Sequence, residues 1–149
     1  ELNIAISKSI SGNIYLGASY ATGTQPTDTY LGDNNVNSIT IGAGYHTPLK
    51  ENADAMVKGD VILGSVKTGG NSTSENGFDI GAGIRAQLGK KFEGTLAIIH
   101  SSTSGGIFAS TNTFVNAQLG FNFTTKIQMT ADVDFTPDRT SSLKLRYFY

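Results

Sequence analysis

Two residues of this sequence have types and a spacing that could perform nucleophilic catalysis. His100 and Ser102 form a His-x-Ser arrangement, in which an imidazole could activate a hydroxyl. A simpler interpretation is the polar end of a strand entering a loop, and we favour it. His46, the other histidine, is expected in an interior or interface position beside a turn. Because two isolated histidines do not make a metal site, no metal ligands are predicted.

Two carboxylates are also candidates for a catalytic pair. Asp132 and Asp134 would share one face of a strand, as a general acid and base would. Lys144 and Arg146 follow on what would be the adjacent strand, and cross-strand pairing with these cations explains the carboxylates more simply. We therefore predict no catalytic residues.

The composition narrows the class of protein. Charged residues make up only 15% of the chain and the net charge is -1, so no nucleic-acid partner is expected. The absence of cysteine excludes a disulfide framework and a thiol nucleophile. No segment approaches the roughly 18 apolar residues of a membrane helix, and Gly and β-branched residues recur throughout. The sequence indicates an all-β protein.

Alternation of apolar and polar residues is the dominant pattern, and it is typical of strands with two different faces. It is readable in nine segments, which are residues 2–10, 14–22, 38–46, 53–64, 78–88, 92–101, 115–123, 127–135 and 143–149. Short turns at 11–13, 50–52, 89–91 and 124–126 interleave with longer polar loops at 23–35, 69–76, 102–112 and 136–141. Turns of this kind favour antiparallel hairpins, so residues 1–149 are predicted to form one antiparallel β-barrel domain.

The polar face carries charges of both signs in nearly equal number. We expect them to form an enclosed network in the lumen, because buried charges persist when they are paired. The members of this predicted lumen charge network are Lys58, Asp60, Asp79, Arg85, Glu93, Asp132, Asp134, Lys144 and Arg146. Glycines on the same face would leave room for the larger side chains.

Aromatic residues on the apolar face lie near the ends of the segments. The residues of these two predicted girdles are Tyr20, Tyr45, Phe78, Phe92, Phe121, Phe123 and Phe135. Girdles that bound an aliphatic band are what a barrel crossing a bilayer requires. In a bilayer every strand must be paired on both sides, so the sheet is expected to close.

The end of the chain resembles a known family. Leu143, Leu145, Tyr147 and Tyr149 alternate as in the C-terminal signature of bacterial outer-membrane β-barrels, and residues 41–49 and 80–85 look like strand-and-turn units of the OmpA/OmpX-like superfamily. The resemblance implies a closed antiparallel up-and-down transmembrane β-barrel in a bacterial outer membrane, with periplasmic short turns and extracellular long loops. It also implies lipid, lipopolysaccharide and the barrel assembly machinery as partners, with Tyr149 as the key residue of the assembly signal, and no cofactor.

The number of strands is left open at 8 to 10. Barrels of this family have even numbers of strands, whereas nine segments are readable. Either eight strands begin at Ile14, or a ten-stranded barrel lacks its first strand. We favour the second alternative, because residues 2–10 pair naturally with residues 14–22 across a tight turn.

Three functions are compatible with these patterns. The first is a non-enzymatic outer-membrane barrel of structural, adhesive or narrow-conduit type, with a lumen filled by side chains. The second is an outer-membrane lipid-modifying enzyme, because His100 and Ser102 resemble the His-x-Ser of lipid A deacylases, although residues 108–124 lack the acid of that family. The third is a soluble ligand-binding barrel with the two faces inverted.

Overall fold

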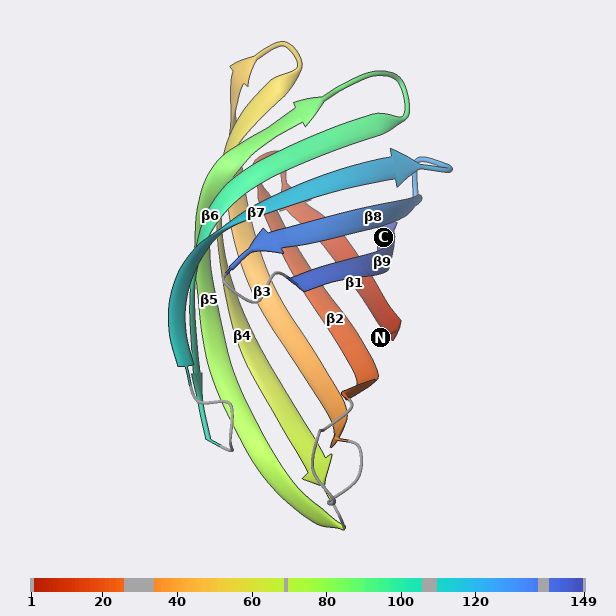
Figure 1. The fold of residues 1–149 in the computed structure, drawn as a ribbon. Helices are drawn as coiled ribbons and strands as arrows, with labels where there is room; N and C mark the ends of the chain where they lie inside the picture. Colours follow the sequence, from red (N-terminus) through yellow and green to blue (C-terminus); the bar gives the residue numbers. More distant parts are fainter. Residues whose placement is uncertain (1, 26–33, 69, 106–109, 137–139, 149) are drawn as a thin grey trace.

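The chain folds into a single closed barrel (Figure 1). The computed structural model describes residues 2–25, 34–68, 70–105, 110–136 and 140–148. Within these ranges there are nine strands: β1 (Leu2–Ser11), β2 (Ile14–Gln25), β3 (Asn34–Lys50), β4 (Ala53–Thr68), β5 (Asn71–Gln87), β6 (Phe92–Ser104), β7 (Ser110–Asn122), β8 (Ile127–Phe135) and β9 (Thr140–Phe148). No helix in the described part of the chain is long and apolar enough to cross a membrane.

The alternation in the sequence becomes an alternation in burial. Along β8, Gln128, Thr130 and Asp132 are buried, whereas the residues between them are exposed. Successive side chains of a strand point to opposite faces of the sheet. In a closed barrel one of these faces lines the lumen, and here it is the polar one. The predicted all-β barrel with nine strand segments is therefore confirmed.

The closure differs from the prediction. Consecutive strands pair antiparallel from β1 to β9, but β1 and β9 pair parallel, from Asn3↔Lys144 to Ser7↔Phe148. The expectation that all neighbours are antiparallel is wrong at this one seam. The reason is topological: strands that alternate in direction and are odd in number bring the first and last together in the same direction.

The described strands also test the eight-stranded alternative. The strand β1 belongs to the wall, so an eight-stranded barrel beginning at Ile14 is wrong. In the structure of residues 1–149, β1 pairs directly with β9, so no other described strand lies between them. The nine described strands complete the ring.

All four of the polar segments predicted as loops are partly strand. Residues 71–76 were expected in a loop but form the start of β5, and Asn71 lies opposite Thr68 of β4. Gly70 has a φ of 90°, a conformation that glycine adopts readily and that suits a tight hairpin. Likewise β6 continues to Ser104 and β7 begins at Ser110. Runs of Ser, Thr and Asn resemble loops in composition, but their backbones extend the ladders here.

The wall of the barrel is uneven in height (Figure 1). The strands β3, β4 and β5 have 17, 16 and 17 residues, whereas β8 and β9 have 9 each. We call the end with the β1–β2, β3–β4, β5–β6 and β7–β8 turns the short-turn end, which lies uppermost in Figure 1, and the opposite end the long-loop end. The long strands extend furthest toward the long-loop end.

Cysteine cross-linking tests the parallel seam, since the chain has no cysteine of its own. Ile4 and Leu145 are register partners on the outer face. We expect Ile4→Cys with Leu145→Cys to form a disulfide in the folded protein, because adjacent strands bring Cα atoms within the range a disulfide requires. The loop closed by this bond changes the mobility of the unreduced, denatured chain on a gel.

The matched control combines Ile6→Cys with Leu143→Cys on the same two strands. These positions are offset by four residues, or about 13 Å along the strand, so they should not cross-link. Equal cross-linking of the two pairs, or none in the first, would contradict the seam.

Candidate functional site

The two faces of the barrel have the reverse polarity of a water-soluble barrel. Buried apolar side chains in the described residues are Ala5, Val66, Ala97 and Ile99, whereas the buried polar side chains are Asn3, Asn34, Asn116, Gln128, Thr130 and Asp132. Large apolar side chains are exposed on every strand, for example Ile6, Leu16, Ile41, Val61, Ile80, Leu96, Leu119, Met129 and Leu145, with exposed fractions between 37% and 59%. The apolar surface therefore runs around the whole barrel.

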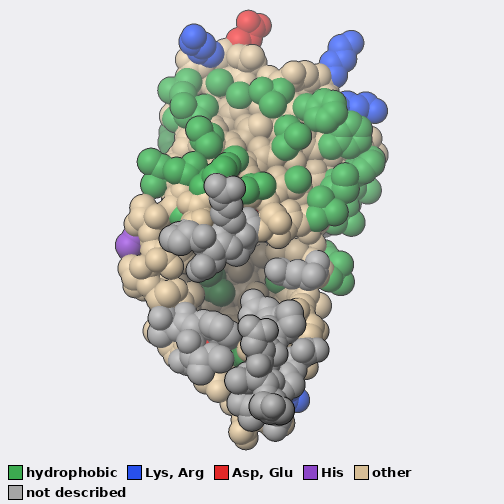
Figure 2. Space-filling view, viewed as in Figure 1, with side chains coloured by type: hydrophobic (Ala, Val, Ile, Leu, Met, Phe, Trp, Pro, Cys, Tyr) green, Lys and Arg blue, Asp and Glu red, His purple; other side chains and the backbone are tan. Residues whose placement is uncertain are grey.

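The apolar surface does not cover the full height of the barrel. Figure 2 shows hydrophobic side chains gathered toward the short-turn end, with few on the described surface nearer the long-loop end. We call the first region the outer apolar band. The second, the polar extension, consists of outward-facing Asn35, Asn37, Ser65, Ser72, Ser74, Asn76, Ser104, Thr111 and Thr113. The long strands thus carry two chemically different outer surfaces.

Two ion pairs join members of the predicted lumen charge network. Lys58 Nζ lies 3.1 Å from Asp60 Oδ2 on β4, and Lys144 Nζ of β9 lies 3.4 Å from Asp132 Oδ2 of β8. The Asp132 side chain is only 4% exposed. A carboxylate this buried requires a partner, because transfer of an unpaired charge out of water is costly. Lys144 supplies that partner from the adjacent strand, as the sequence predicted.

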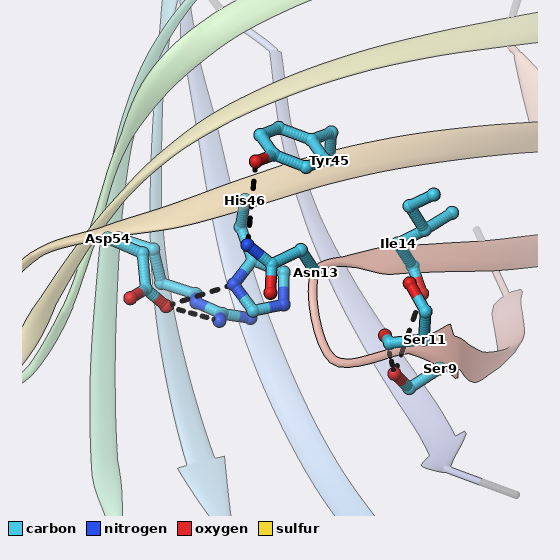
Figure 3. A network of polar contacts seen from close by, with 8 residues as sticks. Ser9, Ser11, Asn13, Ile14, Tyr45, His46 and Asp54 are labelled. Carbon is cyan, nitrogen blue, oxygen red and sulfur yellow. Dashed lines mark hydrogen bonds and ion pairs between the residues drawn. The ribbon is translucent and has the colours of Figure 1, made fainter.

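A third cluster contains residues that the network did not include. Arg85 Nη2 of β5 lies 2.6 Å from Asp54 Oδ2 of β4, and His46 Nδ1 of β3 lies 3.5 Å from the same oxygen. Figure 3 shows Asp54 and His46 side by side, with Asn13 of the first turn close by. His46 thus occupies the interior position expected for it. Asp54 has the same parity as Lys58 and Asp60, and this signal was available in the sequence.

The other network members make different contacts. Asp134 accepts a hydrogen bond of 2.7 Å from Asn116 Nδ2. Arg146 lies opposite Gln128, so the register does not bring it beside either of the two aspartates predicted to pair with the cations of β9. The register places Asp134 and Arg146 six residues apart along the β8–β9 ladder.

Asp79 and Glu93 also face the lumen. Asp79 lies directly opposite Asp60, and its buried Oδ1 has no hydrogen-bond partner among the described residues. Glu93 stands opposite Gln87 on one side and Gly120 on the other. The sequence therefore placed these charges on the correct face but could not assign their partners.

Interior glycines accommodate large side chains from the adjacent strands. The ring of Tyr15 on β2 lies over Gly44, its register partner on β3. The Asp60 carboxylate covers Gly42 in the same way, and the Gln128 amide covers Gly120. A Cβ atom at any of these glycines would meet the covering side chain at less than 3.0 Å. Each glycine thus leaves a space, and the side chain from the neighbouring strand fills it.

Aromatic residues gather at the short-turn end of the outer face. The ring centroids of Phe92 and Phe121 lie 5.1 Å apart, and Phe121 meets Phe123 edge to face at 4.9 Å. Tyr45 and Tyr147 also point outward near this end. Edge-to-face and tilted pairs at these distances are favourable, so the three phenylalanines form one cluster.

The second predicted girdle lies nearer the long-loop end. Tyr20, Phe78 and Phe135 are between 44% and 54% exposed on the outer face. The Tyr20 hydroxyl lies 3.1 Å from Asn37 Oδ1, and the Phe78 ring lies 6.4 Å from that of His100. These residues mark the boundary between the outer apolar band and the polar extension.

The His-x-Ser pair has hydroxyl partners. His100 Nδ1 lies 2.9 Å from Thr113 Oγ1, and Ser102 Oγ lies 3.2 Å from Thr111 Oγ1. All four side chains come from β6 and β7 on the outer face. A nucleophile is activated when its base contacts it and a third group orients the base. Here each residue of the pair contacts a threonine on the neighbouring strand instead.

No set of three or more His, Asp or Glu side chains in the described ranges is arranged to hold a metal ion.

The proposed assembly signal lies on β9. Leu143, Leu145 and Tyr147 alternate outward, with exposed fractions of 58%, 51% and 40%. Tyr149 lies outside the described residues. The three described members form one apolar row beside the parallel seam.

Comparison with protein-family models, curated proteins and solved structures finds no match to this chain.

Substitution of Gly44 tests the packing of the lumen. We expect Gly44→Ala to destabilise the barrel by about 1–3 kcal/mol, because the new methyl group overlaps the Tyr15 ring. In a Tyr15→Ala background the same substitution should cost much less, since the two sites are in contact. The free energy of unfolding in urea measures both values.

Gly59→Ala is the matched control. Gly59 faces outward, and the nearest atom to a new Cβ lies 4.0 Å away, so its effect should stay within about 0.5 kcal/mol. An equal cost at Gly44 and Gly59 would show that the Tyr15 ring does not occupy this space.

The ion pair at Asp132 gives a second test. We expect Lys144→Met to lower the free energy of unfolding by about 2–4 kcal/mol, because it leaves a buried carboxylate unpaired, and Asp132→Asn in addition should recover most of that loss. Urea titration of the folded barrel measures this. The exposed Lys67→Met serves as the control and should be nearly neutral. No recovery in the double variant would contradict the pairing.

Proposed function

We propose that this protein is a non-enzymatic integral β-barrel of the bacterial outer membrane, of structural, adhesive or narrow-conduit type. The observation that carries the proposal is the polarity of its faces. Apolar side chains ring the exterior, and the buried polar side chains of the interior are four amides, one hydroxyl and one carboxylate among the described residues. A hydrocarbon solvent outside and a polar interior account for both faces at once.

The soluble alternative requires the opposite arrangement. Soluble monomers rarely expose a contiguous apolar patch of more than a few hundred Å². Ile80 and Leu119 would have to be shielded from water, yet they are 59% and 50% exposed. A surface of this kind, continued over all nine described strands, favours lipid over water as the surrounding medium.

The height of the outer apolar band supports the proposal. On β5 and the residue after it, the outward apolar positions run from Phe78 to Leu88. Ten steps of about 3.3 Å along a strand tilted by about 40° rise about 25 Å, which matches the apolar band of outer-membrane barrels. Tyr20, Phe78 and Phe135 then lie at one interface, and the cluster of Phe92, Phe121 and Phe123 lies at the other.

The lumen side chains favour a narrow passage or none. Barrels of about eight strands have interiors just wide enough for side chains to fill. Tyr15, Asp60 and Gln128 reach across adjacent glycines, and ion pairs cross-link neighbouring strands. These contacts favour a structural role over that of a wide pore.

The polar extension supports contact with molecules outside the membrane. Its serines, threonines and asparagines continue β3 to β7 beyond the apolar band, where they can hydrogen-bond to sugars or protein surfaces. Lipopolysaccharide is the proposed neighbour on this side. The outward row Leu143, Leu145 and Tyr147 is the proposed site for the assembly machinery.

A charged substitution in the apolar band tests membrane insertion. Ile84 lies near the middle of the apolar stretch from Phe78 to Leu88, between outward-facing Ala55 and Leu96. We expect Ile84→Arg to cost about 2–4 kcal/mol in phosphatidylcholine vesicles, because the guanidinium would meet hydrocarbon. The free energy of unfolding in urea measures the cost.

Asn76→Arg is the matched control on the same face of the same strand. It lies in the polar extension and should cost at most about 1 kcal/mol. A folded chain that stays dispersed in detergent-free buffer and tolerates Ile84→Arg would refute the proposed membrane location.

A further inference from the structure

The exposed charges at the short-turn end are almost all positive. Among the described residues of the four short turns, the cations are Lys50, Lys90, Lys91 and Lys126, and the one acidic residue is Glu51. All five side chains are exposed. Figure 2 shows basic side chains around this end, above the hydrophobic surface. We call the four lysines the basic rim.

The basic rim adjoins the outer apolar band directly. Lys50 follows exposed Leu49, Lys91 precedes exposed Phe92, and Lys126 precedes exposed Ile127. Lys91 Nζ also lies 5.8 Å from the centroid of the Phe121 ring, in the aromatic cluster. From the middle of the barrel toward its end, the surface therefore passes from aliphatic to aromatic to cationic.

The rim differs from the other charged regions of the barrel. In the lumen, Lys58, Arg85 and Lys144 each lie within 3.4 Å of a carboxylate oxygen. The polar extension presents neutral hydroxyl and amide groups, with Lys67 as the described cation beside it. Among the described residues, a concentration of like charge next to an apolar surface therefore occurs at the short-turn end.

We propose that the basic rim binds the headgroups of anionic phospholipids in the membrane leaflet that faces the short turns. The sequence of apolar and cationic regions along the barrel surface matches the arrangement of a phospholipid. The acyl chains would lie against the apolar band and the phosphate against the lysines. Lysine stems extend along apolar surface while their ammonium groups reach the interface. This inference rests on the proposed membrane location and adds to it a lipid class and an orientation.

Each lysine near an anionic membrane surface strengthens association about fivefold. The test uses the barrel reconstituted in phosphatidylcholine bilayers that contain spin-labelled phosphatidylglycerol or spin-labelled phosphatidylcholine. Electron paramagnetic resonance measures the fraction of each lipid that is immobilised at the protein surface. We expect phosphatidylglycerol to be preferred at least fivefold, and the preference to fall when the salt concentration is raised.

The variant with Lys50→Gln, Lys90→Gln, Lys91→Gln and Lys126→Gln should reduce this preference to about one. Lys67→Gln, at the opposite end, should leave it unchanged. Gln retains a polar side chain of similar length, so the apolar and aromatic contacts of the rim stay available. Retained preference in the fourfold variant, or equal loss in the Lys67→Gln control, would overturn the proposal.

The measurement separates this inference from the proposal on which it depends. If neither spin-labelled lipid is immobilised, the chain does not reside in the bilayer and the proposed function fails. If both lipids are immobilised equally, the membrane location stands and the binding of anionic lipid is refuted.

Discussion

In the proposed bilayer, each strand of this barrel needs a hydrogen-bonded neighbour on both sides, and the hydrogen bonds between β1 and β9 close the ring. An unpaired strand edge is tolerable in water but costs several kcal/mol per group in hydrocarbon. The parallel register satisfies this need without mixing the two faces, since Asn3 and Lys144 both turn inward while Ile4 and Leu145 both turn outward. Closure and the separation of polar from apolar surface therefore depend on the same seam.

The strands themselves could be predicted from the sequence because period-two alternation is a local property. Closure was predicted, but the parallel pairing that makes it could not be, since whether residues 2–11 meet β9 depends on distant parts of the chain. The polar ends of β5 and β7 were missed for a different reason. Ser and Asn are frequent in loops, so the composition of residues 71–76 predicted a loop. The preceding Gly69-Gly70 pair, which signals a tight hairpin between two strands, was given less weight.

For the lumen charges, the sequence predicted the face of the sheet on which they lie but not the partner that each one contacts. Parity alone put Lys144 and Asp132 on the same face, whereas the partner of each charge depends on register and on side-chain length. Asp54 was omitted although it lies in the predicted segment 53–64 and shares the parity of Lys58. Tyr15 has the parity of the polar face in the sequence, but its position over Gly44 follows only when the register of β2 with β3 is known.

The unequal strand lengths give the molecule an oblique rim. From Ile127 to Phe135, β8 offers eight steps, or about 20 Å of height, against about 25 Å on β5. In the proposed bilayer setting, lipid beside β8 and β9 must compress by about 5 Å or the barrel must lean toward that side. In either case the bilayer beside β8 and β9 would differ in thickness or angle from the bilayer beside β5. Neighbouring membrane proteins would then approach one side of the barrel more readily than the other.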